Sequence, residues 1–417
     1  MKKLTKAHGN WVDGGRFFDR KQALADLTDR FEEGGHCSLT AQRRMGKTSL
    51  ARELCRQLNE RGDYHCFFID VEEAQLPEDV IKDLVVVTQT VHSLWEKGLG
   101  LFKNAMGSIL DRVEEISAME VGIKIRAGLD AGNWQEKGDA LFELIAGQDK
   151  KILIVIDELS IFINRILKNK TYDITPEARE LTDIFLSWLR KNAQLHKGKI
   201  RFMFSGSIGL DPILKQAGLN AATNVFPVYD LSPWDKTTTC ECLEALARQY
   251  NVHLETGVCE KIYSLLGAGI PNYVQNFFDA LHTDARHRKK SEISIEDVKR
   301  VYKETILGVR GTSDLEHYES RLKDVLGEPL YTLALDILTE TAVNKTLDTS
   351  SLLAFRDQYQ AQLPDSEAAI KEVLYVLEHD GYICSHGTGY SFVLNLLRQW
   401  WLARHQTFYT PIKDRMP

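Results

Sequence analysis

A glycine–lysine–threonine loop, placed between a short apolar segment and an amphipathic helix, constrains this chain more than any other feature. Residues 38–49 read SLTAQRRMGKTS. Leucines then recur every fourth residue, at Leu50, Leu54 and Leu58, which predicts a helix with one buried stripe. A strand, a loop and a helix in this order can bring backbone N–H groups together on an anion at a helix N-terminus. The pattern predicts an α/β core that binds a polyphosphate.

The residue types inside the loop suit such a ligand. Gly46 lets the backbone approach a phosphate without a Cβ clash. Lys47 is predicted to reach the β- and γ-phosphates, and Thr48 to place its hydroxyl on Mg²⁺. The residues expected to bind the nucleotide are Ala41, Gln42, Arg43, Arg44, Met45, Gly46, Lys47, Thr48 and Ser49.

The loop departs from the usual G-x-x-x-x-G-K-[ST] pattern at its entrance, where Ala41 replaces the first glycine. An alanine there costs about 1 kcal/mol if the backbone needs a positive φ, but it removes no phosphate ligand. We therefore expect a working site with an atypical entrance. Arg43 and Arg44 either add positive charge near the phosphates or are solvated loop residues.

Two acids follow the apolar run of KILIVIDEL at 151–159, which is typical of a strand covered on both faces. Parallel sheets present ligands at the carboxyl ends of their strands. Asp157 is therefore predicted to bind Mg²⁺, and Glu158 to polarise the attacking water as general base. Alternatively, the two acids only begin a helix, whose dipole favours negative charge. Asp70, at the end of the apolar strand expected at 66–70, is a rival metal ligand. We expect it instead to have a capping role after this strand.

A further apolar strand is predicted at 201–204, and it precedes Ser205, Gly206 and Ser207. Ser205 is predicted to lie beside the γ-phosphate and to report hydrolysis. The alternative is a turn that simply needs small residues. Strands that alternate with helices predict a parallel, doubly wound sheet. Adenine is the expected base, since no N-K-x-D element stands at a suitable spacing for guanine.

The pattern of the chain predicts three domains. Residues 1–231 form the P-loop core, in which 74–150 are a mostly helical insertion. Residues 232–310 read as an all-helical lid. Residues 311–417 contain several helices and then YICSHGTGYSFVL at 382–394, which is typical of a hairpin around a glycine-rich turn. Helices followed by such a hairpin predict a C-terminal winged-helix domain.

Three motifs in the core together resemble the archaeal-type ATPases of the signal-transducing STAND branch of AAA+-like P-loop proteins. They are TAQRRMGKTSLARE, ILIVIDEL and FMFSGSIGL. The segment LLGAGIPNYVQNFFDAL (265–281) resembles the G-x-P element of the helical lid, and this resemblance implies that Pro271 lies near the nucleotide. FFDRKQAL (17–24) resembles an aromatic-Gly-Arg-Glu segment near the adenine, with Asp19 and Gln22 departing from it. The resemblance covers about residues 15–405 and implies an ATP-driven switch.

Composition limits the surroundings of such a switch. The 417 residues are 43% hydrophobic and 27% charged, with a formal net charge of −7, so no global basic field attracts nucleic acid or membrane. No run of about 18 uncharged apolar residues predicts a membrane span. Seven scattered cysteines favour a reducing cytoplasm over a disulfide framework. The apolar residues of 84–102 face a partner or a membrane surface, or else pack into the core.

The predicted winged helix has the wrong charge for DNA. Residues 330–417 hold seven Lys/Arg and ten Asp/Glu, a net charge of −3, whereas phosphate neutralisation requires positive charge. The helix expected at 366–379 carries three glutamates and one lysine. We therefore expect this domain to pack on its own core or on a protein partner. The basic run RHRKK at 286–290 is the better nucleic-acid candidate, unless it is a solvated loop.

The leading hypothesis is a cytoplasmic, Mg²⁺-dependent ATPase that binds ATP between core and lid and rearranges the lid and winged helix. Turnover is expected to be slow without a protein partner or a homo-oligomer, because no arginine finger can be named from the sequence. Two alternatives stay open. One is a scaffold that binds nucleotide without turnover, and the other is a DNA-binding regulator.

Overall fold

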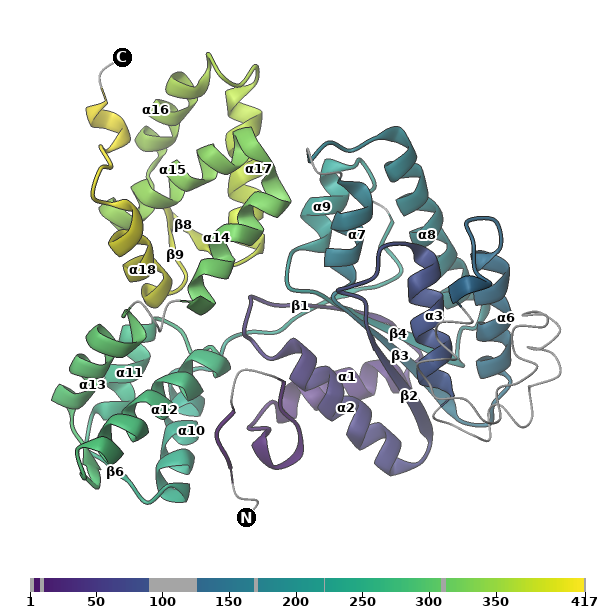
Figure 1. Ribbon diagram of the computed structural model, residues 1–417, viewed down its shortest axis with the longest axis horizontal. Helices are drawn as coiled ribbons and strands as arrows, with labels where there is room; N and C mark the ends of the chain where they lie inside the picture. The colour runs from purple at the N-terminus through teal and green to yellow at the C-terminus, as the bar shows by residue number, and fades with distance from the viewer. Residues whose placement is uncertain are drawn as a thin grey trace. The chain divides into compact units, whose positions relative to one another are not determined.

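The computed structural model of the chain separates into two compact units (Figure 1). One holds residues 20–40 and 47–231; the other holds 1–19, 41–46 and 232–417. Most of the apolar stretch at 84–102 lies outside the described residues. The structure describes residues 4–7, 11–89, 126–168, 172–220, 222–308 and 313–415.

The first unit is built on a five-stranded sheet in the order β2-β3-β4-β1-β5, and every neighbouring pair is parallel. This confirms the predicted parallel sheet. β3 and β4 are buried along nearly their whole length, as expected of central strands covered on both faces. The strands are β1 (Cys37–Thr40), β2 (Tyr64–Asp70), β3 (Lys151–Asp157), β4 (Ile200–Ser205) and β5 (Val228–Asp230).

Helices cover both faces of this sheet (Figure 1). An apolar core lies between one face of the sheet and the helices α3, α6, α7, α8 and α9. α8 begins as its sequence predicts: Pro176 follows Thr175, whose hydroxyl accepts a hydrogen bond from the Ala178 N–H at 3.2 Å. The helices are α1 (Lys21–Glu32), α2 (Lys47–Arg61), α3 (Pro77–Thr88), α6 (Trp134–Ala146), α7 (Leu159–Leu167), α8 (Pro176–Leu195) and α9 (Leu210–Gln216).

The second unit begins its long C-terminal part with the predicted helical lid. A two-residue parallel pair of strands, β6 (His253–Leu254) and β7 (Glu292–Ile293), joins the lid helices. The helices are α10 (Lys236–Gln249), α11 (Val258–Leu266), α12 (Pro271–His287) and α13 (Ile295–Val301), which continues into a π-helical turn at Tyr302–Ile306.

A winged helix follows the lid in the same unit. Its antiparallel hairpin, β8 (Ile383–His386) with β9 (Gly389–Phe392), pairs through Tyr390 with Leu347. Trp401 is fully buried and donates from Nε1 to Thr339 Oγ1 at 3.1 Å, which anchors the last helix. The helices are α14 (Ser313–Leu326), α15 (Glu328–Asn344), α16 (Thr349–Tyr359), α17 (Ser366–His379) and α18 (Asn395–His405).

The observed fold class is the predicted one: a parallel α/β core, a helical lid and a winged helix. The helix predicted at 366–379 is α17 with the same bounds. The exact boundaries of the three domains stay a prediction. Within the described part of the chain, no helix combines the length and the hydropathy needed to cross a membrane.

Candidate functional site

The entrance of the phosphate-binding loop is unstrained at Ala41. Within the loop, only Arg44 (φ 66°) and Gly46 (φ 88°) adopt positive φ, and Ala41 does not. The cost that was expected if Ala41 needed a positive φ therefore does not arise. The left-handed position that needs glycine is the one at Gly46. The strained residue of the loop is Arg44, because a non-glycine residue in this region costs about 1 kcal/mol or more.

The carboxyl end of β3 brings three predicted site residues together. Thr48 Oγ1 donates a hydrogen bond to Asp157 Oδ2 at 2.6 Å, and Ser205 Oγ donates to Asp157 Oδ1. Asp157 is 2% exposed, so its carboxylate is nearly removed from solvent. The strand order explains the cluster: β4 lies between β1 and β3, and parallel strands end at the same edge.

Lys47 and Ser49 lie in the first turn of α2, where backbone N–H groups have no intrahelical partner. Both residues are buried, at 7% and 8% exposure. A lysine at this position adds a full positive charge to the positive end of the helix dipole. Together with Gly46 immediately before it, this arrangement suits a phosphate group.

Ser207, for which the sequence predicted no separate role, holds Glu158 in place. Glu158 directly precedes α7 and has a left-handed backbone conformation, with φ 58°. Its Oε2 accepts hydrogen bonds from the Ser207 backbone N–H at 2.8 Å and from Ser207 Oγ at 2.6 Å. The half-buried carboxylate therefore faces Ser207 rather than open solvent.

Residues 205–207 make two kinds of contact. The two serines are polar partners of the two acids, whereas Gly206 meets the need for a small residue. A Cβ atom at Gly206 would lie 2.0 Å from Ser160 Oγ in the first turn of α7. The turn after β4 is therefore packed directly against the start of α7.

Asp70 has the capping contact that we expected. Its Oδ1 accepts a hydrogen bond from the Glu72 N–H at 3.0 Å. The residue stands beside Asp157 in the β2–β3 register. Desolvation and then the negative charge of Asp157 raise the pKa of Asp70, although the Glu72 N–H opposes this change.

The G-I-P segment of the lid packs against Trp234, which sequence reasoning did not single out. The backbone N–H of Trp234 donates a hydrogen bond to the Gly269 carbonyl at 2.9 Å. A Cβ atom at Gly269 would lie 2.4 Å from the Trp234 carbonyl oxygen. Pro271 begins α12 directly afterwards. Phe18 meets the Trp234 ring edge-on, with centroids 5.6 Å apart. Trp234 thus contacts both of the segments that the resemblance places near the nucleotide.

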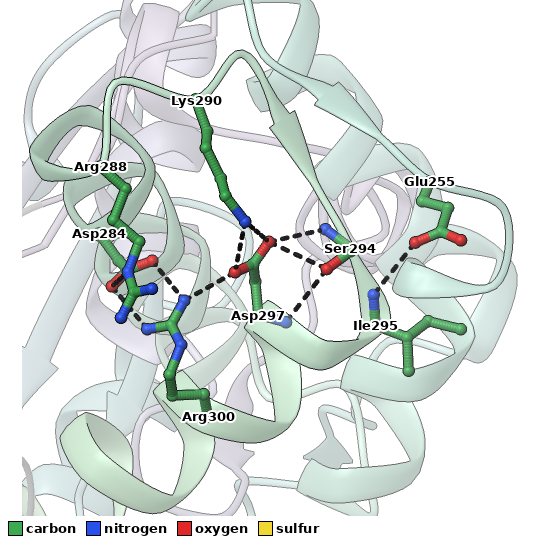
Figure 2. Close-up of polar contacts among 8 residues, drawn as sticks. All are labelled: Glu255, Asp284, Arg288, Lys290, Ser294, Ile295, Asp297 and Arg300. Carbon is green, nitrogen blue, oxygen red and sulfur yellow. Dashed lines mark hydrogen bonds and ion pairs between the residues drawn. The ribbon is translucent and has the colours of Figure 1, made fainter.

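The basic run at the end of α12 is partly neutralised (Figure 2). Arg288 Nε lies 3.2 Å from Asp284, and Lys290 Nζ lies 3.3 Å from Asp297. Arg300 bridges both acids, at 2.7 Å from each. Two of the four Lys/Arg side chains in the run therefore already have carboxylate partners, which weakens the case for a nucleic-acid surface here.

These features define a class: a P-loop NTPase with a helical lid and a C-terminal winged helix. A family described as the ATPase domain found predominantly in Archaea matches residues 17–277, which is more than half of the chain. The chain belongs to this family and is an ATPase of the Walker type. This confirms the archaeal-type ATPase suggested by the sequence motifs.

Solved structures share the fold at low sequence identity. A Walker-type ATPase of Pyrococcus abyssi is 17% identical, with a TM-score of 0.59 over 94% of this chain and 97% of that chain. The ORC2 protein of Aeropyrum pernix, in ADPNP–ADP complexes, is 12% identical, with a TM-score of 0.56 over 96% of this chain and 98% of that chain. No curated protein matches the sequence.

The residues at the end of β3 suit a magnesium ion. Mg²⁺ prefers oxygen ligands and is usually held by one or two carboxylates together with phosphates and waters. Asp157 and Thr48 offer such oxygens within 2.6 Å of each other. No group of three or more His, Cys, Asp or Glu that could hold a metal is found among the described residues, and this mode of binding does not require one.

Proposed function

We propose that the chain is a Mg²⁺-dependent ATP-hydrolysing switch, with the P-loop residues 41–49 as its phosphate site. The observation that carries this proposal is the hydrogen-bonded group of Thr48, Asp157 and Ser205 at the end of β3. A buried carboxylate that accepts a hydrogen bond from a P-loop hydroxyl would hold Mg²⁺ together with that hydroxyl.

Each residue then has one task in hydrolysis. Lys47 neutralises charge on the phosphates, and Thr48 and Asp157 would hold a Mg²⁺ ion, which would supply charge stabilisation for the reacting phosphate. Glu158 accepts the proton of the attacking water at its carboxylate. Ser205, bonded to Asp157, is placed to respond when the γ-phosphate leaves.

The two Ser207 hydrogen bonds restrain the Glu158 carboxylate through Oε2, so turning this group toward a water costs part of that interaction. This restraint supports slow turnover in the isolated chain.

Phe18, Trp234 and the G-I-P segment before α12 supply an aromatic and apolar surface. Pro271 is the residue of this group that the family resemblance places near the nucleotide. Loss of the γ-phosphate would then reorient the lid and the winged helix.

The output of the switch is proposed to be a protein contact or a homo-oligomer in a STAND-type ATPase. The acidic character of the predicted winged-helix block supports a protein partner rather than DNA. A reducing compartment such as the cytoplasm suits the seven cysteines, all of which are free thiols.

Steady-state phosphate release from ATP tests the hydrolytic part of the proposal. Lys47→Ala and Glu158→Gln are each expected to lower the rate by about two orders of magnitude or more. Glu180→Gln is a matched control, because Glu180 is an exposed acid on α8. Equal rates for the wild type and both site variants would exclude hydrolysis at this site.

Calorimetry separates the scaffold alternative from the enzyme. A scaffold would bind ATP and lose that binding in Lys47→Ala, yet release no phosphate in the wild type. The proposed switch binds ATP, releases phosphate, and retains ATP binding in Glu158→Gln.

A further inference from the structure

Residues 4–7 form a short strap on the helical lid, inside the second unit. Lys6 is only 8% exposed, although this segment has no regular secondary structure. Its backbone N–H donates a hydrogen bond to the Tyr250 hydroxyl, at the end of α10, at 3.1 Å. The Ala7 N–H donates to Gln275 Oε1 on α12 at 2.8 Å. The strap therefore ties together two lid helices that are far from it in the sequence.

The ammonium group of Lys6 lies in a buried site made by α12 and the end of α10. Its Nζ lies 2.6 Å from Asp279 Oδ1 and 2.6 Å from His282 Nδ1. It also lies 4.8 Å from the centroid of the Tyr250 ring and 5.8 Å from that of Phe278. One carboxylate, one imidazole nitrogen and two aromatic faces thus replace the water that a buried ammonium loses.

This contact requires a neutral His282. The short bond to the Asp279 carboxylate indicates a charged Lys6. An ammonium group has three donors and no acceptor, so His282 Nδ1 accepts and the ring proton belongs on Nε2. A protonated His282 would instead place a second donor and a second positive charge 2.6 Å from Lys6 Nζ. The docked strap and a protonated His282 therefore exclude each other.

The charged groups that act on His282 come from the strap and from α12. Burial lowers the pKa of His282 most, and the charges of Lys6 and Arg286 lower it further, whereas Asp279 raises it. From the end of α10, the Tyr250 ring faces His282, with ring centroids 5.0 Å apart. His282 is therefore neutral near pH 7 while the strap is docked, and it binds a proton more readily once Lys6 has left.

We propose that Lys6 and His282 form a pH-sensitive latch, in which residues 4–7 strap α12 at neutral pH and leave it when His282 is protonated. Since a lowered pKa in the docked state means that protons favour release, the latch weakens as the pH falls below about 6.5. Asp279, one turn earlier on the same helix, is then placed to pair with the protonated imidazole.

Release of the strap has a local consequence for the lid. It removes the two backbone hydrogen bonds to Tyr250 and Gln275, and the ion pair with Asp279. Amides that are protected only by such contacts exchange with solvent when the segment opens. The Lys6 and Ala7 amides are therefore direct reporters of the latch.

Hydrogen–deuterium exchange of the full chain between about pH 5 and 8, corrected for the pH dependence of free-amide exchange, tests the proposal. In the wild type, protection of the Lys6 and Ala7 amides should fall by about tenfold or more toward pH 5, because like charges in contact disfavour docking. Protection of α15, in the winged helix, should not change.

Two variants separate the partners of the latch. His282→Asn offers an amide oxygen near the place of Nδ1 but cannot gain a proton, so protection of the strap should not depend on pH. Lys6→Met retains an apolar stem without the charge, so protection should be lower at pH 8 and should not fall further in acid. His287→Asn is the matched control, because His287 is exposed on the same helix, and it should behave as the wild type.

Equal protection of the strap at pH 5 and pH 8 in the wild type would overturn the latch, as would an acid-induced loss of the same size in His282→Asn. A loss shared by α15 would show that the unit unfolds in acid, which also overturns it. Should His282→Asn not fold, Lys6→Met decides, because an acid-induced loss that persists without the ammonium group counts against the proposal. None of these results depends on ATP.

Discussion

Replacing Ser207 with alanine is expected to increase the rate of ATP hydrolysis, because Ser207 restrains the carboxylate assigned as general base. Glu158 Oε2 accepts two hydrogen bonds from this residue, one from the backbone and one from the hydroxyl. The substitution removes the 2.6 Å hydroxyl bond and leaves the 2.8 Å backbone bond. Glu158 can then turn toward a water at lower cost while it stays near its place.

The size of the effect follows from these contacts. A hydrogen bond to a charged group contributes about 1.5–3 kcal/mol, and exchange with water returns part of it because Glu158 is only half-buried. A net reduction of about 1 kcal/mol in the activation barrier corresponds to a rate increase of about fivefold. Steady-state phosphate release at saturating ATP measures it.

Three further variants make this result interpretable. Ser207→Thr retains the hydroxyl and should keep the wild-type rate. Ser205→Ala removes the partner of Asp157 and should lower the rate. A rate below that of the wild type in Ser207→Ala, with an unchanged thermal midpoint, would refute the reasoning, because Ser207 would then hold Glu158 in its productive position. A gain that survives in the Glu158→Gln background would show that the effect does not act through Glu158.

Other predictions test packing, protonation and charge. Gly206→Ala should cost about 1–3 kcal/mol of stability in thermal unfolding, because its Cβ meets Ser160 Oγ, and adding Ser160→Ala should restore part of it. Burial, followed by the charge of Arg201, lowers the pKa of His36 from 6.5, so the unfolded chain binds a proton more readily than the folded one. The free energy of unfolding, measured in urea, should therefore fall as the pH decreases below about 6.5. The fall should be smaller in His36→Gln. Fluorescence anisotropy with duplex DNA at physiological salt should show no binding that depends on Arg286 and Lys289; a salt-sensitive signal lost in the double glutamine variant would contradict this.

The sequence predicted most of the sheet, because its central strands are buried on both faces and show as continuous apolar runs. It missed β5. Val228–Asp230 is only three residues long, and Val228 is 51% exposed, so no periodicity marks it. Its strand character comes from parallel pairing with β1, a tertiary contact between residues far apart in the chain.

The cluster at the carboxyl end of β3 was predictable for a related reason. Parallel strands place their carboxyl ends at one edge, so Thr48, Asp157 and Ser205 meet once the strands are recognised. The partnership of Ser207 with Glu158 was not predictable, because it depends on the left-handed backbone of Glu158 at the start of α7. Trp234 was also missed, since it contacts segments that are distant in sequence and shows no local pattern.

The winged helix packs closely on the phosphate loop, whereas its helix α17 has the wrong charge for reading DNA. A DNA reader needs free positive charge on the recognition helix. In α17, Lys371 is paired with Glu367 at 2.5 Å, and Glu372 and Glu378 add further negative charge.

The turn after the same helix leaves no space for a side chain beside Gln42. The packing of Gly381 on Gln42 and the negative charge of α17 both favour the proposed protein contact over a DNA-reading role for the winged helix.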